Sequence, residues 1–589
     1  MDFKRIMKIF LIWRIKHVSD KNFMLILAVI VGIAVGLAAV LMKNAVHLVR
    51  EVAVTIIDRY SFSYLYIIFP ALGILLTVLF VKYIVKKKLG HGIPMVLYNI
   101  SRNQGEIESH NMWSRIVGSS LTVGFGGSVG LEGPIVATGA AIGSNIGRMF
   151  NLSYRQVILL IGCACTGAIA AIFKAPVAAI IFTLEVIMLD LTMSSLLTLL
   201  MASMSAALTS YLFMGQNCLY FVEKTDLFVL SDVPFYILFG VLCGLLSVYF
   251  SKLYLWINEF FKNWKSKWAK FVVCVVVLGG LVFLFPSLYG EGYESVNMAL
   301  QGDISYLFEN TIYAGWDSWL GIIVILSLII LLKIFATGVT FNAGGVGGIF
   351  APALFLGANI GLFFSKIFNS IGFQISEENF ALVGMAGLLA GIIHAPLTAI
   401  FLIAEITEGY SLFVPLMIVS AIAYFTVKIF MPNSVYTIML AKRGNLLTHN
   451  ADSNMLSMLR MENLIEKNFH TLNEDSNLRT LVEVIKHSNR NVYVVVDEQN
   501  NLKGLVFLDH VRHMIFNPEF YDNVFVRDLM YMPRSIVELD MSVREVAEIF
   551  EKSEDYNLPV VDNGKYIGFV SRAKVFSKYR QMLKQFSSD

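Results

Sequence analysis

The sequence has 589 residues, of which 56% are hydrophobic and only 15% are charged, and its mean hydropathy is +0.67. This composition excludes an ordinary soluble domain for most of the length and indicates that much of the chain lies in lipid. The formal charge of +3 is close to balance, and no clustered basic face is visible, which argues against a nucleic-acid partner.

Residues 1–20 predict an amphipathic helix on the cytoplasmic membrane surface, because Lys and Arg alternate there with Ile, Phe and Trp. A signal peptide fits less well, since charge persists and no small-residue cleavage site follows. Residues 21–441 predict a membrane domain. Apolar runs that approach or reach the roughly 20 residues needed to span a bilayer cover residues 23–42, 66–85, 235–254, 271–286 and 320–336. Lysines at 86–88 close the second run and place that end in the cytoplasm by the positive-inside tendency.

The five cysteines lie in or beside apolar segments, without the paired spacing of a zinc site or the framework of a small disulfide-stapled domain. We therefore expect no metal site, and we interpret these residues as packing residues: Cys163, Cys165, Cys218, Cys243 and Cys274.

The membrane domain contains an internal repeat. Residues 170–186 parallel residues 390–406, so that Pro176 matches Pro396 and Glu185 matches Glu405, both 220 residues apart. Upstream, Gly139, Ala140 and Gly143 match Gly357, Ala358 and Gly361 at a separation of 218 residues. Glycine-mediated helix packing is one explanation. Recurrence in register favours two inverted repeats, about residues 21–215 and 230–441, with the transport site between them.

Three glycine-rich segments stand where apolar helices are expected to begin: GHGIP at residues 90–94, GLEGP at 130–134 and GGIFAP at 347–352. Proline is tolerated in a first helical turn and glycine permits the sharp turn before it. The residues concerned are Gly90, Gly92, Pro94, Gly130, Gly133, Pro134, Gly347, Gly348 and Pro352. Helix N-termini carry partial positive charge, so three that converge would bind a dehydrated anion without a full cation.

Glu132 is the only acid within residues 121–145. An ionisable group in such an apolar stretch is a functional-site hypothesis, although a helix-capping acid is the simpler alternative. A carboxylate at a helix N-terminus can occupy an anion's own binding site and leave it open when protonated or displaced.

These three segments in this order, followed by Tyr436 in SVYTIML, resemble the signature set of the CLC chloride channels and transporters over nearly the whole chain. The resemblance implies an all-α polytopic membrane domain of broken, tilted helices, and a homodimer with one chloride pathway per subunit. It implies that Glu132 is the gating glutamate. It also implies that the Tyr436 hydroxyl and the backbone amides of Ile349 and Phe350 bind the central anion.

Three positions depart from the family pattern. His91 stands where chloride-type members have Ser, nitrate-type members Pro and fluoride-type members Met or Asn. Its imidazole either donates a hydrogen bond to the anion or turns away and leaves only the backbone. Leu131 replaces an Arg found in many members, which removes a positive charge.

The third departure is Val186, at the position of the glutamate that passes protons in the coupled exchangers. Valine carries no proton, so the sequence favours passive or uncoupled conduction. The alternative is a chloride/proton antiporter in which Glu185 or Asp190 replaces the missing acid. Matched structural roles for Glu185 and Glu405 are a further interpretation.

Residues 442–589 predict a soluble cytoplasmic α/β domain with its own repeat, since residues 491–509 are echoed by 557–574. Each copy predicts a hairpin, turning at residues 499–500 or 563–564. An amphipathic helix precedes each hairpin, at residues 478–487 and 543–552. The pattern resembles tandem CBS domains, at about residues 460–517 and 525–584, a module that often senses adenine nucleotides.

Neither copy has the full nucleotide-binding pattern. The first has Phe507 and His510 in place of the hydroxyl and the acid, with Asp509 one position early, and the second has Ser571 but Lys574. Asp509 and Ser571 are therefore weak nucleotide candidates, and a purely structural or dimer-stabilising role is the alternative.

Two other classes of protein fit less well. The sequence shows no nucleophile–base pair, metal-ligand cluster or phosphate-binding GxxxxGK, so an enzyme is not expected. A CBS-bearing cation transporter would need several midplane acids. We expect a multi-pass protein of the plasma (inner) membrane with both termini in the cytoplasm and no cofactor in the transport domain.

Overall fold

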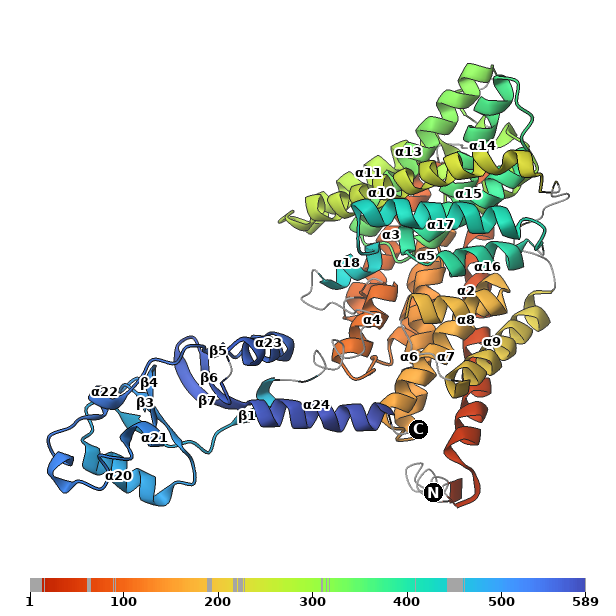
Figure 1. Cartoon of the computed structure of the whole chain (residues 1–589). Coiled ribbons are helices and arrows are strands. Elements are labelled where there is room, and N and C mark those ends of the chain that lie inside the picture. The colour runs from red at the N-terminus through yellow and green to blue at the C-terminus, as the bar shows by residue number, and fades with distance from the viewer. Residues whose placement is uncertain are drawn as a thin grey trace. The chain divides into compact units, whose positions relative to one another are not determined.

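Figure 1 shows the computed structural model of the chain. It describes residues 13–14, 16–60, 65–87, 89–90, 92–187, 193–215, 220, 226, 228–308, 311–313, 315–316, 318–407, 409–441, 459, 461–553 and 555–587. The expected helix at residues 1–20 lies largely outside this part. The chain divides into an N-terminal unit, Met1–Leu446, and a C-terminal unit, Leu447–Asp589.

The described part of the N-terminal unit is helical. Its helices are α2 (Asp20–Tyr60), α3 (Leu65–Phe80) continued by a π-helical turn (Val81–Val85), α4 (Gly92–Arg102), α5 (Asn111–Gly124), α6 (Glu132–Met149), α7 (Tyr154–Phe173), α8 (Pro176–Glu185), α9 (Met193–Met214), α10 (Val233–Lys262), α11 (Lys267–Leu284), α12 (Tyr293–Leu300), α13 (Trp319–Ala343), α14 (Phe350–Ser370), α15 (Glu377–Ile393), α16 (Pro396–Ile406), α17 (Phe413–Phe430) and α18 (Val435–Ala441). Nine helices in the described part are long and apolar enough to cross a membrane, judged by length and composition.

The internal repeat appears as two matched sets of helices, α6–α8 and α14–α16. Helix α6 packs on α7 as α14 packs on α15. Serine side chains cap the N-termini of α7 and α15, from Ser153 and Ser376. Both helices then end at a left-handed residue, Lys174 or His394, with φ of 57° and 59°. The following Ala-Pro pair starts α8 or α16, as expected for proline in a first turn.

Helices α8 and α16 lie side by side (Figure 1) and cap one another. The Glu185 carboxylate, at the end of α8, accepts hydrogen bonds from the N–H groups of Leu397 and Thr398, at 3.1 and 2.8 Å. The Glu405 carboxylate, near the end of α16, accepts from the N–H groups of Val177 and Ala178, at 3.0 and 2.8 Å. Each of these backbone donors and carboxylate acceptors has its counterpart 220 residues away, as a twofold relation between the halves predicts.

The C-terminal unit is α/β, with two sheets. One has the strand order β1-β7-β6-β5 and the other β2-β3-β4. The strands are β1 (Ile465–Glu466), β2 (Thr471–Asn473), β3 (Val492–Val496), β4 (Leu502–Phe507), β5 (Val537–Glu538), β6 (Asn557–Asp562) and β7 (Lys565–Ser571). The helices are α20 (Leu478–His487), α21 (Leu508–Val511), α22 (Val526–Leu529), α23 (Val543–Ser553) and α24 (Arg572–Ser587).

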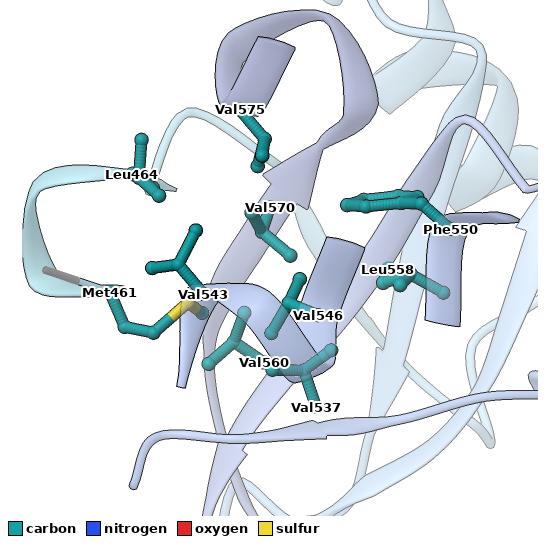
Figure 2. Packing of buried hydrophobic residues seen from close by; sticks show 10 residues of the cluster. All are labelled: Met461, Leu464, Val537, Val543, Val546, Phe550, Leu558, Val560, Val570 and Val575. Carbon is teal, nitrogen blue, oxygen red and sulfur yellow. The ribbon is translucent and has the colours of Figure 1, made fainter. Parts of the chain in front are cut away.

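Both predicted hairpins form. Strands β3–β4 and β6–β7 pair antiparallel, and left-handed residues at Asn500, Asn563 and Gly564 make the turns. The predicted amphipathic helices are α20 and α23, whose apolar faces cover the sheets. Figure 2 shows the core beneath α23, where Val546 and Phe550 meet strand residues such as Val560 and Val570.

Candidate anion-binding site

The three glycine-rich segments meet inside the N-terminal unit. Gly92 lies so close to Gly133 that a Cβ atom on Gly92 would come within 2.7 Å of the Gly133 carbonyl carbon. A Cβ on Gly133 would lie 3.2 Å from the Gly348 Cα. Gly130 and Gly348 form an antiparallel bridge, in which each N–H donates to the other's carbonyl, at 3.0 and 2.7 Å. Only glycine allows backbones to approach this closely.

The helices that begin at this point have proline as their third residue: Pro94 in α4, Pro134 in α6 and Pro352 in α14. Their first turns differ from those of α7 and α15. Neither Leu131 nor Ile349, the N-cap residues of α6 and α14, makes a side-chain capping bond. The N–H groups of a first helical turn have no partner within the helix, so these two termini present donors to an outside acceptor.

Glu132 provides one such acceptor. It is the first residue of α6, its side chain is 1% exposed, and its Oε1 accepts a 2.5 Å hydrogen bond from the N–H of Phe350, the first residue of α14. Its Oε2 has no hydrogen-bond partner among the described residues. The Glu132 carboxylate thus binds the N-terminus of the other helix, α14. Its carboxylate lies where an anion bound at the α14 N-terminus would lie.

A small cavity of about 20 Å³ adjoins the meeting point. This is the space that a single water molecule or small ion needs. Residues from all three segments line it, together with two tyrosines: Gly92, Gly133, Gly348, Ile349, Tyr254 and Tyr436. The structure thus brings Tyr436 and Ile349, two of the predicted anion ligands, to one cavity.

Tyr254 is a residue that the sequence reasoning missed. It lies on α10, is 2% exposed and packs edge-on against Phe341 at 5.9 Å. A single tyrosine in an apolar span carries no local signal, and only the packing of α10 brings it to the cavity.

The remaining sequence candidates lie as follows. Gly90 precedes α4, and His91 falls outside the described residues. Val186 is buried at the end of α8, and Asp190 also lies outside the described residues. Glu185 accepts three hydrogen bonds at the α16 N-terminus, the third from the Thr398 hydroxyl at 2.6 Å.

A cluster of three ionisable residues lies beside Leu131, and the sequence did not predict it. Glu291 accepts a 3.2 Å hydrogen bond from the Leu131 N–H, next to the gate candidate. Lys43 of α2 and Lys333 of α13 both interact electrostatically with Glu291. Lys333 has 0% exposure and lies 4.6 Å from the Phe355 ring centre. The three residues are far apart in the sequence, so no local pattern groups them.

In the C-terminal unit the two nucleotide candidates are separated. Ser571 lines a cleft of about 550 Å³, which Asp509 does not line; Asp509 instead pairs with Arg512 at the surface, 2.7 Å away. Glu466 lies in the cleft and accepts hydrogen bonds from Ser571 and Arg490, at 2.7 and 2.9 Å. Burial acts to raise the pKa of Glu466, but these bonds and the nearby positive charges outweigh it and lower the pKa below its ordinary value.

Comparison with known protein families decides the identity of the fold. The family described as voltage gated chloride channel matches residues 72–428, and the CBS domain family matches residues 461–517 and 526–580. The chain belongs to the voltage gated chloride channel family. The resemblance to CLC proteins with C-terminal CBS domains is thus confirmed. Members of this family are membrane channels and transporters, and the chain is not an enzyme.

Relatives of this CLC chain include proteins named for different modes of transport. The H(+)/Cl(−) exchange transporter ClcA of Vibrio cholerae is 29% identical over 421 residues, which are 67% of this chain and 84% of the relative. The chloride channel protein CLC-f of Arabidopsis thaliana is 24% identical over 531 residues, 78% of this chain and 66% of the relative. A crystal structure of a eukaryotic CLC transporter superposes with a TM-score of 0.61 at 19% identity, covering 94% of this chain and 97% of that one. This likeness confirms the predicted fold class, a mostly helical membrane region followed by a CBS region.

Proposed function

We propose that this protein transports chloride across a membrane through the site where α4, α6 and α14 begin. The observation that carries the proposal is the convergence of Gly92, Gly133 and Gly348 on a cavity lined by Tyr436. Uncapped helix N-termini stabilise an anion by oriented N–H groups and partial positive charge. None of the described residues that line the cavity is a lysine or arginine, whose full charge would hold the anion too tightly for rapid release.

We propose Glu132 as the gate of this pathway. Its carboxylate makes the hydrogen bond to Phe350 that a bound anion would otherwise accept, so the carboxylate and the anion compete for one place. Protonation removes the negative charge that holds the side chain against the amide, and the site becomes free. Protonation and displacement are therefore two routes to one open state.

We favour passive or uncoupled conduction over proton antiport. Val186 occupies the position of the internal proton glutamate, and valine cannot transfer a proton. Glu185, one candidate replacement, has its carboxylate bound by three donors at the α16 N-terminus, which supports a structural role. A chloride/proton antiporter that uses Asp190 or another acid remains the alternative.

The same proposal includes a homodimer in the plasma (inner) membrane with both termini cytoplasmic. The lysines at residues 86–88 follow the π-helical turn after α3, which supports a cytoplasmic location for that end. If the end of α3 faces the cytoplasm, the start of α3 lies on the outer side of the membrane. The C-terminal end of α2, which comes just before α3 in the chain, then faces outward as well.

Reconstitution in liposomes tests the function. Purified protein is placed in vesicles with a chloride gradient, and chloride and pH are followed together. Chloride flux without proton movement supports uncoupled conduction, whereas proton movement against its own gradient, driven by chloride, establishes antiport. Glu132→Gln removes the charge but keeps the shape, so we expect flux that no longer depends on pH. A pH dependence identical to that of the natural protein refutes the gate.

For the C-terminal unit, we propose a regulatory or dimer-stabilising role, with adenine nucleotide as a candidate ligand of the cleft around Ser571. The basic side chains of Arg490 and Lys574 favour an anionic ligand. However, Ser571 and Arg490 already donate hydrogen bonds to Glu466. Thermal stability with and without ATP or AMP tests this, with Ser571→Ala as the variant. Stabilisation that persists in this variant places the nucleotide elsewhere.

A further inference from the structure

The cavity where the three glycine-rich segments meet has room for one small ion, so an ion that enters it touches the groups on every side. The side chains that line the cavity are apolar, with two exceptions among the described residues. These are Tyr254 of α10 and Tyr436 of α18, whose hydroxyls are the only side-chain hydrogen-bond donors in that part of the lining. A bound anion therefore has two phenol groups beside it.

The ring of Tyr254 is held in place by other aromatic side chains. It is 2% exposed, packs edge-on against Phe341 at 5.9 Å and stacks on Phe250 with ring centres 6.3 Å apart and planes inclined by 19°. Its hydroxyl interacts electrostatically with that of Tyr436, which is 6% exposed. The two hydroxyls thus lie near one another at the same cavity.

Two asparagines, one helical turn further along α10 and on the facing helix α13, surround the Tyr254 hydroxyl. Nδ2 of Asn342 donates to the Gly338 carbonyl at 3.0 Å and to Oδ1 of Asn258 at 2.8 Å. The Asn258 oxygen is therefore bonded to Asn342, and its Nδ2 faces elsewhere. This nitrogen is buried without a hydrogen bond of normal geometry among the described residues, and Asn258 interacts with the Tyr254 hydroxyl.

This arrangement determines the direction of the Tyr254 hydroxyl proton. An amide NH₂ group can only donate hydrogen bonds, whereas a phenol hydroxyl donates one and also accepts. Asn258 therefore approaches the Tyr254 oxygen as a donor, and the hydroxyl proton stays available for another acceptor. An anion in the cavity is such an acceptor, and a hydrogen bond to a charged group is stronger than one between neutral groups.

We propose that Tyr254 is a second anion-binding tyrosine of this site, which donates its hydroxyl proton to the chloride ion in the cavity. Asn258 is a positioning residue that keeps this proton directed at the ion. The inference rests on the proposed function of the cavity and adds a side-chain ligand to it. Two neutral hydroxyls replace part of the water that the ion sheds, and they add no fixed charge that would slow its release.

Chloride binding to the purified full-length protein tests the proposal. Binding is measured by titration calorimetry at constant ionic strength, with gluconate as the replacing anion. Tyr254→Phe removes the hydroxyl but keeps the ring and its aromatic contacts, and we expect the chloride Kd to rise about tenfold. Asn258→Leu should raise the Kd by a smaller factor, about threefold. It should have no further effect when combined with Tyr254→Phe, because no hydroxyl is left to orient.

Tyr249→Phe is the matched control, since it removes a hydroxyl from the same helix at a residue that does not line the cavity. We expect this variant to bind chloride like the natural protein. An unchanged Kd in Tyr254→Phe overturns the inference, as does an equal rise in Tyr249→Phe. An undiminished effect of Asn258→Leu in the Tyr254→Phe variant overturns the positioning role. If the natural protein itself binds no chloride, the proposed function is wrong, and the two failures are distinguished.

Discussion

The reciprocal caps between α8 and α16 allow a quantitative prediction. Glu405→Ala removes an acceptor from two backbone N–H groups, and Glu185→Ala removes one from two N–H groups and a hydroxyl. Hydrogen bonds to a charged group contribute about 1.5 to 3 kcal/mol each. At the lower figure, we expect losses of about 3 kcal/mol for Glu405→Ala and about 4.5 kcal/mol for Glu185→Ala.

The assay is the apparent melting temperature of the detergent-solubilised protein, compared at one heating rate because unfolding of such proteins is often irreversible. We expect drops of several degrees, larger for Glu185→Ala than for Glu405→Ala. Thr398→Val is the matched control, since it removes only the hydroxyl bond to Glu185. It should account for most of the difference between the two alanine variants.

The two caps hold the same pair of helices, so the double variant should lose less than the sum of the single losses. Glu185→Gln keeps an acceptor oxygen, and we expect chloride flux close to that of the natural protein. Melting temperatures of both alanine variants within about 1 °C of the natural protein would refute the reasoning, since a loss of 1 kcal/mol commonly moves Tm by more than that.

Three further predictions follow from the site and the C-terminal unit. Gly92→Ala places a methyl group against the Gly133 backbone, and we expect chloride flux to fall about tenfold or more. Gly90→Ala is the control and should remain active, because its added Cβ would lie at an ordinary 3.4 Å from the Met95 side chain. Lys333→Met removes the hydrogen bonds to the Leu288 and Gly290 carbonyls and should destabilise the protein by about 1 to 3 kcal/mol, measured as a lower melting temperature. The pKa of Glu466 is lowered in the folded protein. Its hydrogen bonds therefore stabilise the C-terminal unit fully at pH values above the ordinary pKa of a carboxyl group, and this stabilisation is lost as the pH falls through the lowered pKa of the folded state. Hydrogen exchange of peptides covering β1 and β7, corrected for intrinsic rates, should accelerate only under these acidic conditions, and Glu466→Gln should show a smaller dependence on pH.

Much of the fold could be predicted because a helix that crosses lipid needs a long, mainly apolar run of residues, which is visible in the sequence. Each predicted apolar run lies inside one helix, except that residues 66–85 include a π-helical turn and residues 271–286 extend just past α11. The repeat was visible because glycine and proline mark helix starts that no other residues make easily. The C-terminal hairpins followed from alternating apolar residues and turn residues. In contrast, the pairing of β1 with β7, which joins the start of the first CBS segment to the end of the second, has no local signature.

The site could be predicted only where residues lie next to one another in the sequence. Glu132 was found because it stands alone in an apolar stretch and beside a glycine motif. Tyr254, Lys43 and Lys333 have no such neighbours, and tertiary packing alone gives them their surroundings. The internal repeat indicated matched structural roles for Glu185 and Glu405. The hydrogen-bond partners of Glu185 in α16 could be identified only from the structure.

Glu132 and Phe350, which are joined by a hydrogen bond, are counterparts in the two halves, since they are separated by the same 218 residues as Gly130 and Gly348. The Phe350 ring is buried, 5.9 Å from both Phe173 and Phe182. An acid at position 350 would place a second carboxylate opposite the first, each able to dock on the other helix, and mutual repulsion would force one to take up a proton. With a phenyl ring at position 350, Glu132 supplies the one carboxylate of this pair between the two helix N-termini. The duplicated architecture thus places two equivalent helix N-termini together, and the proposed gate role of Glu132 depends on the difference between positions 132 and 350.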